Sequence, residues 1–283
     1  YMSRTKSESS KHLHDPDFLS KSASLFNNRD VRALNVNFQS AQAGDVIPDR
    51  NVEIPQEYVL PSVNRALLDM RDLEISQLSQ NNDVRTFINK LQRVTRNVDV
   101  DIGTGEAFTD TLVAHLLFRA INFDQWPMIV ELHPMLKFSV GQSVFSAKVG
   151  FVINSKHFKQ YSMLVVEDKH LANVRPTYGY GEPQIVAEML ACGDENIREA
   201  HMAYDMIIFV VRVVSTYVTF YRASIQKDYW DELSLGCPQK HSITIFRWPG
   251  NNSDPFLGFD LAESNGRKDV LEALCKIRQY IME

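Results

Sequence analysis

A glutamate and a lysine stand two residues apart in the segment VVEDK, residues 165–169. Because side chains alternate along a β-strand, Glu167 and Lys169 would project from one face of a strand while Asp168 points to the other. The carboxylate could hold a divalent cation, and the ammonium could stabilise charge or position an attacking water. A Glu-x-Lys pair also occurs on ordinary solvent-facing strands, so the pair alone leaves both interpretations open.

The surrounding segments predict the elements that would position this pair. A helix is expected over residues 105–123, with Thr104 as its N-cap and Glu106 in its first turn. A second helix is expected to begin with Gln184 and to end at Gly193. Strands are expected at residues 136–140, 146–153, 162–169, 207–214, 217–224 and 242–248, and further helices at 61–78, 84–94 and 266–282. From residue 104 onward this order favours an α/β sandwich.

The segments SAKVGFVI, VVEDK and QIVAEML, preceded by a helix with an early glutamate, resemble the core of the PD-(D/E)XK nuclease superfamily. The likeness is greatest to the nuclease-like domains of Crinkler-type effectors and related fungal proteins, and it covers residues 103–192. It implies a restriction-endonuclease-like αβββαβ core with a mixed sheet, a helical N-terminal extension and a C-terminal helix. Residues 1–60 are rich in Ser, Asn, Asp and Lys, so we expect a polar, partly disordered arm there, which could lie against the main body. It would precede a nuclease-like α/β domain at residues 61–283, with its core at 103–225.

The resemblance also implies a role for each matching residue. Glu167 would be a metal ligand, Lys169 would orient or deprotonate the nucleophilic water, and Glu106 would complete the metal site. Gln184 would help to hold the scissile strand or the lysine. Gly150 occupies the position where the family has an aspartate, and no Asp or Glu lies between Glu131 and Glu167.

The missing acid leaves two functions open. Mg²⁺ or Mn²⁺ in such a site normally binds one or two carboxylates, so a site without the aspartate would hold the metal weakly. The chain is then either a metal-dependent endonuclease, a hydrolase of DNA or RNA with an impaired metal site, or a pseudoenzyme. As a pseudoenzyme it would bind nucleic acid or protein and would need no cofactor.

The distribution of charge along the sequence favours a small nucleic-acid-binding site over a binding surface that covers much of the protein. The chain has a net charge of −5 and a pI near 5.9, which argues against a basic coat. Near the candidate site, however, acids are absent from residues 132–166. We expect Lys148, His170 and Arg175 to contact phosphates there, since such contacts need charge and no base recognition.

Composition limits the class of protein. With 44% hydrophobic residues the chain can build a substantial core. Three separated cysteines without a CxxC pattern indicate reduced thiols, so we expect an intracellular protein, nuclear or cytoplasmic. No apolar stretch is long enough to cross a bilayer, and the oligomeric state stays open. His115 is expected on the polar side of its helix, where it would have a structural role.

Overall fold

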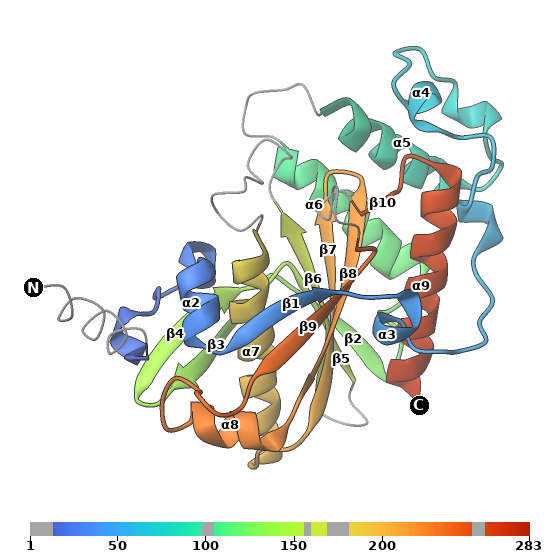
Figure 1. Ribbon diagram of the computed structural model, residues 1–283. Coiled ribbons are helices and arrows are strands. Elements are labelled where there is room, and N and C mark those ends of the chain that lie inside the picture. The colour runs from blue at the N-terminus through green and yellow to red at the C-terminus, as the bar shows by residue number, and fades with distance from the viewer. Residues whose placement is uncertain (1–13, 98–104, 156–159, 169–180, 251–257) are drawn as a thin grey trace, which may run out of the picture.

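The framework of the fold is a mixed β-sheet. The computed structural model describes residues 14–97, 105–155, 160–168, 181–250 and 258–283, with the backbone alone described at 105, 106 and 160–168. The strands of the main sheet are β1 (Val36–Ser40), β2 (Met128–Leu132), β5 (Phe151–Ser155), β6 (Gln160–Asp168), β7 (Met206–Val214), β8 (Tyr217–Ile225), β9 (Ile243–Trp248) and β10 (Phe259–Asp260). They form an eight-stranded sheet in the order β1-β9-β8-β7-β6-β5-β2, with β10 beside β8 (Figure 1).

Strand direction changes around β6, the strand that carries the Glu-x-Lys segment. β6 pairs antiparallel with β5 and parallel with β7. A parallel neighbour requires a crossover connection, and the helix α7 (Glu182–Ala200) lies in the connection from β6 to β7. β7 and β8 then pair as an antiparallel hairpin, and β1 pairs parallel with β9.

Helices cover both faces of the sheet and make two hydrophobic layers (Figure 1). One layer contains α5 (Asn82–Arg96), α6 (Gly105–His115), the π-helical turn η6 (Leu116–Ala120) and α9 (Ser264–Met282). The other contains α7, α2 (Asn28–Ala33), α8 (Lys227–Leu233) and the hairpin of β3 (Met135–Val140) and β4 (Ser143–Lys148). Side chains alternate along β7, so this strand contributes to both hydrophobic layers. Val211 and Val213 face the α6 layer, while Ile208 and Val210 face the α7 layer.

These elements confirm the expected α/β class with a mixed sheet. The strands expected at residues 207–214, 217–224 and 242–248 match β7, β8 and β9, and the helices expected at 84–94 and 266–282 match α5 and α9. Among the described residues, no helix is both long enough and apolar enough to cross a membrane.

Two expected elements were wrong. The segment 61–78 is not one helix: α4 spans only Arg65–Leu68, and a 3-10 turn follows at Ile75–Gln77. The segment 146–153 is not one strand, because β4 ends at Lys148 and β5 begins at Phe151 in a different sheet. At the break the amide of Val149 bonds to the carbonyl of Pro134, and the amide of His133 bonds to the carbonyl of Gly150.

The expected helix end at Gly193 was also wrong, since α7 continues to Ala200. A Cβ atom at Gly193 would lie 2.3 Å from two ring atoms of Trp230 on α8. Trp230 is itself buried. Gly193 therefore serves a close helix-to-helix approach and does not terminate the helix.

One strand from the N-terminal 60 residues, β1, belongs to the main sheet. β1 pairs with β9 over five residues, from Val36 opposite Ile243 to Ser40 opposite Arg247. The hydroxyl of Tyr229 on α8 donates to the carbonyl of Leu34 at 2.8 Å, and Leu34 is fully buried. This region thus closes one edge of the sheet.

Candidate functional site

The carboxyl end of β6 is where the sequence places the catalytic pair. Glu167 is the Cα partner of Val213 on β7, and Asp168, the last residue of β6, is the partner of Val214. Lys169, His170 and Arg175 lie outside the described residues. Glu167 thus stands on an interior strand of the sheet, next to a neighbour whose side chain packs in the α6 layer.

Glu106 lies in the first turn of α6, and its backbone alone is described. α6 packs against β6 and β7. The residue that the sequence assigns to the metal site from a helix is therefore on an element that contacts the strand of Glu167.

Gly150 supplies no carboxylate next to this strand. Its carbonyl accepts the amide hydrogen of His133 at 2.8 Å, immediately before β5 begins. Across the part of the chain that the structure describes, no group of three or more His, Cys, Asp or Glu side chains is arranged to hold a metal ion. The side chains of Glu106 and Glu167, which the resemblance assigns to a Mg²⁺ or Mn²⁺ centre, lie outside the described part of the structure.

Gln184 is not in the layer of α6. It lies near the start of α7, where its Nε2 donates to Oε1 of Glu188 at 2.6 Å. Glu188 is 1% exposed, and the neighbours of Gln184 on α7, such as Ile185, pack in the opposite layer from Val213. Gln184 therefore orients a buried carboxylate in the described structure.

A cluster of polar side chains lies between the start of α7 and the sheet, and we call it the ionic layer: Glu182, Arg212, Tyr221 and Arg247. Nη1 of Arg247 on β9 contacts Oε1 of Glu182 at 2.5 Å. The hydroxyl of Tyr221 on β8 donates to the same oxygen at 3.2 Å. Nη1 of Arg212 on β7 donates to the Tyr221 hydroxyl at 3.4 Å. β8, β9 and α7 therefore meet at the Glu182 carboxylate, and β7 joins them through the Tyr221 hydroxyl.

Burial sets the electrostatics of the ionic layer. Arg212 is 1% exposed, and a charge at such a site is costly unless partners compensate it. Burial raises the pKa of Tyr221 above its ordinary value, and the charge of Glu182 adds to the rise, while Arg212 opposes it. The Tyr221 hydroxyl therefore keeps its proton at neutral pH and serves as a donor to Glu182.

Pattern reasoning did not find the ionic layer, although one signal was present. Arg212 interrupts the apolar run of β7, and a charge inside a buried strand requires a polar partner. The sequence could not show that its partners would come from β8, β9 and α7.

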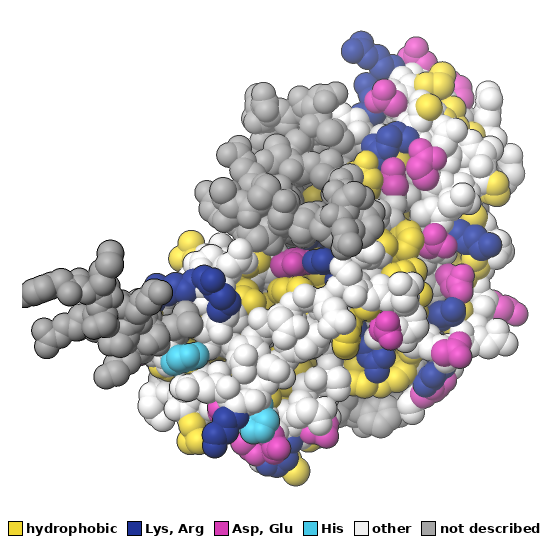
Figure 2. Space-filling model, in the orientation of Figure 1, with side chains coloured by type: hydrophobic (Ala, Val, Ile, Leu, Met, Phe, Trp, Pro, Cys, Tyr) yellow, Lys and Arg dark blue, Asp and Glu magenta, His cyan; other side chains and the backbone are white. Residues whose placement is uncertain are grey.

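The described surface on the face that Figure 2 shows is of mixed charge. Lys148, expected to contact phosphate, is exposed at the end of β4. On the face seen in Figure 2, acidic and basic side chains are interspersed over the α9 side, and the described residues of this face form no broad basic field. This distribution agrees with the overall charge of −5.

No family model matches the chain, and no curated protein sequence matches it.

Proposed function

We propose that this chain is a nuclease-superfamily domain that binds DNA or RNA at the carboxyl end of β6 and hydrolyses phosphodiesters weakly or not at all. The observation that carries the proposal is the order α6, β2, β5, β6, α7, β7. This order agrees with the αβββαβ core that the sequence resemblance implies. Its first strand is β2, however, while the strand expected at residues 136–140 forms β3 in the separate β3–β4 hairpin. The parallel pairing of β6 with β7 across α7 supports it further.

The weak hydrolysis follows from the missing carboxylate. Gly150 stands at the head of β5, directly beside β6, where an aspartate would be needed. Loss of one residue that stabilises the transition state typically lowers the rate on the order of 100-fold or more. Binding is less affected, because phosphate contacts depend on positive side chains such as Lys148, and a metal ion is not essential for them.

Restoring the acid tests the proposal. Gly150 is not among the described glycines with positive φ, so its φ angle does not oppose an aspartate. We expect the wild type to bind labelled DNA or RNA with little cleavage in Mg²⁺ or Mn²⁺. Gly150→Asp should increase cleavage by about 100-fold, and adding Glu167→Ala or Lys169→Ala should abolish that gain.

A matched control is Glu199→Ala, which removes an exposed acid on α7 away from β6. It should leave both binding and cleavage unchanged. Absence of nucleic-acid binding in the wild type and in Gly150→Asp would refute the proposal.

A second candidate is a pseudo-nuclease that binds a protein partner. It is favoured by Gln184, whose amide bonds to the buried Glu188 and thus contributes to the interior of the fold. Binding of a protein partner together with no binding of any nucleic acid would select this candidate.

A further inference from the structure

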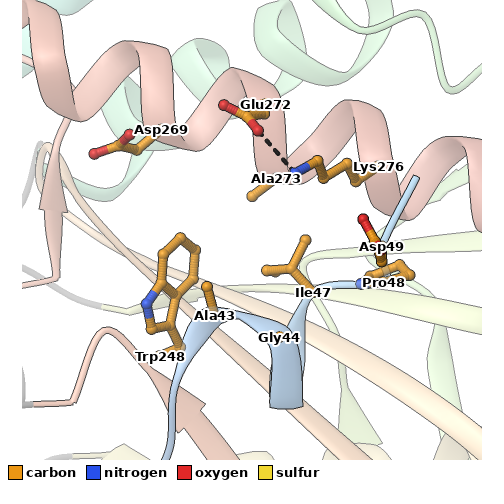
Figure 3. Close-up of a pocket in the computed structure, with 10 residues that line it drawn as sticks. All are labelled: Ala43, Gly44, Ile47, Pro48, Asp49, Trp248, Asp269, Glu272, Ala273 and Lys276. Carbon is orange, nitrogen blue, oxygen red and sulfur yellow. Dashed lines mark ion pairs between the residues drawn. The ribbon is translucent and has the colours of Figure 1, made fainter. Parts of the chain in front are cut away.

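A groove of about 400 Å³ lies between α3 (Ala43–Val46) and α9, on the face of the sheet opposite α7 (Figure 3). Its volume is in the range of small-ligand sites. It is separate from the carboxyl end of β6, since its lining comes from α3, the residues just after it, β9 and α9. Figure 3 shows Trp248 and Gly44 on one side of the groove and the α9 side chains on the other.

Trp248 gives the groove a fixed aromatic wall. Its ring centroid lies 4.5 Å from that of Phe259 and 5.9 Å from that of Phe220. Ring contacts on this scale hold an indole in one orientation. The groove therefore offers a preformed flat surface to a ligand.

The groove also carries an excess of negative charge. Three carboxylates (Asp49, Asp269 and Glu272) and one ammonium (Lys276) line it. The ammonium is engaged, because Nζ of Lys276 contacts Oε1 of Glu272 at 2.8 Å. Partial burial raises the pKa of Asp269, and the neighbouring charge of Glu272 adds to the rise. Asp269 has no hydrogen-bond or ion-pair partner among the described residues.

We propose that this groove binds an arginine side chain of a partner protein. A guanidinium is planar and weakly hydrated, so it can stack on the Trp248 indole while donating two hydrogen bonds to the Asp269 carboxylate. A cation there also offsets the negative charge that Asp49 and Glu272 add to the groove. The same charge repels phosphates, so the groove does not extend the nucleic-acid site.

Capped tripeptides test the charge and shape of the ligand. The probes are acetyl-Gly-Arg-Gly-amide, the same peptide with lysine, and the same peptide with citrulline, which keeps the shape of arginine without its charge. The chain has three tryptophans, so Trp248→Phe identifies the indole N–H signal of Trp248 in an NMR spectrum. The arginine peptide should shift that signal saturably, and citrulline should bind at least about tenfold more weakly. The lysine peptide should also bind more weakly, because an ammonium neither stacks nor pairs in a bidentate manner.

Two variants test the location. A Cβ atom at Gly44 would meet no other atom within 4 Å, so Gly44→Leu should fill the groove without disturbing the backbone and should abolish binding. Asp269→Asn should weaken binding about tenfold, whereas Glu199→Gln, at an exposed site on α7, should not change it. Equal binding of citrulline or lysine, or full binding by Gly44→Leu, would overturn the proposal. Failure of all three peptides to bind would overturn it as well, whatever the result of the cleavage assays.

Discussion

At the scale of single residues, Arg267 stabilises the fold by bonding to the backbone. It is fully buried on α9. Its Nε donates to the carbonyl of Val59 at 3.0 Å, its Nη1 to that of Leu261 at 2.8 Å, and its Nη2 to those of Leu60 at 2.8 Å and Val63. Burial lowers its pKa to about 10, so the charge persists at neutral pH. One side chain therefore satisfies backbone groups from two distant segments.

Replacing this side chain should destabilise the protein. Arg267→Met should lower the free energy of unfolding by about 3 kcal/mol or more, since it strands several buried carbonyls and each typically costs about 1–3 kcal/mol. Urea unfolding followed by far-UV circular dichroism measures the change. Lys268→Met, at the exposed neighbouring position, is the control and should shift the midpoint little. Equal midpoints for the two variants would contradict this role for Arg267.

His115 was expected on the polar side of its helix, but it is 6% exposed and its ring lies about 6 Å from those of Tyr58 and Phe87. Its Nε2 is 3.5 Å from the Tyr58 hydroxyl. Burial lowers the pKa of His115 below its usual 6.5, and the charges of Lys90 and Arg119 lower it further, while Asp83 opposes the shift. The protonated form is thus disfavoured in the folded state.

This shift makes stability depend on pH. Between the folded pKa and 6.5 the unfolded chain binds more protons at His115 than the folded chain does. The contribution of His115 to stability is therefore complete above pH 6.5 and is lost as the pH falls through the window below it. Urea unfolding at a series of pH values from 7.5 to about 5 should show this loss, and His115→Phe should reduce it. His201→Asn, a change at an exposed helix end, should keep the wild-type slope.

At the scale of elements, Gly193 determines how α7 and α8 meet. Alanine is the better helix former by about 1 kcal/mol, yet Gly193→Ala should destabilise by about 1–3 kcal/mol. The added methyl would meet the buried ring of Trp230 at 2.3 Å, and that ring has no space into which to retreat. Thermal unfolding would reveal the sign of the effect.

Gly44 provides the matched comparison, because it is also a helical glycine and a Cβ there meets nothing within 4 Å. Gly44→Ala should leave stability unchanged or raise it by up to about 1 kcal/mol. If both alanine variants raised stability, the contact with Trp230 would not explain Gly193.

The elements that the sequence revealed are those with a strong local pattern. β7 is an apolar run interrupted by Arg212, β8 is rich in β-branched and aromatic residues, and α9 has apolar residues at helical spacing, so local patterns suffice. The break between β4 and β5 at Gly150 is not determined by the local sequence pattern. It exists because the β3–β4 hairpin packs on α7 while β5 joins the main sheet, and a short sequence cannot encode that choice by periodicity.

At the scale of the whole molecule, the candidate site was only partly accessible to sequence reasoning. The expected layout of a helix with Glu106, a strand with Glu167 and a later helix with Gln184 corresponds to α6, β6 and α7. The sequence could not show that the start of α7, with Gln184, packs in the opposite layer from Val213, the neighbour of Glu167. It also could not show that Glu182 and Arg247 form an ion pair. Both contacts depend on the order of the strands in the sheet.

The pairing of β1 with β9 has a consequence for folding during translation. Val36 and its partner Ile243 are 207 positions apart in the sequence. At a synthesis rate of about 5–20 residues per second, β1 leaves the ribosome roughly 10–40 s before its partner exists. During that interval residues 36–40 have no β9 to pair with. Their polar side chains, Asn37, Gln39 and Ser40, help to keep the unpaired segment in solution. The sheet can be completed only after β9 has been synthesised.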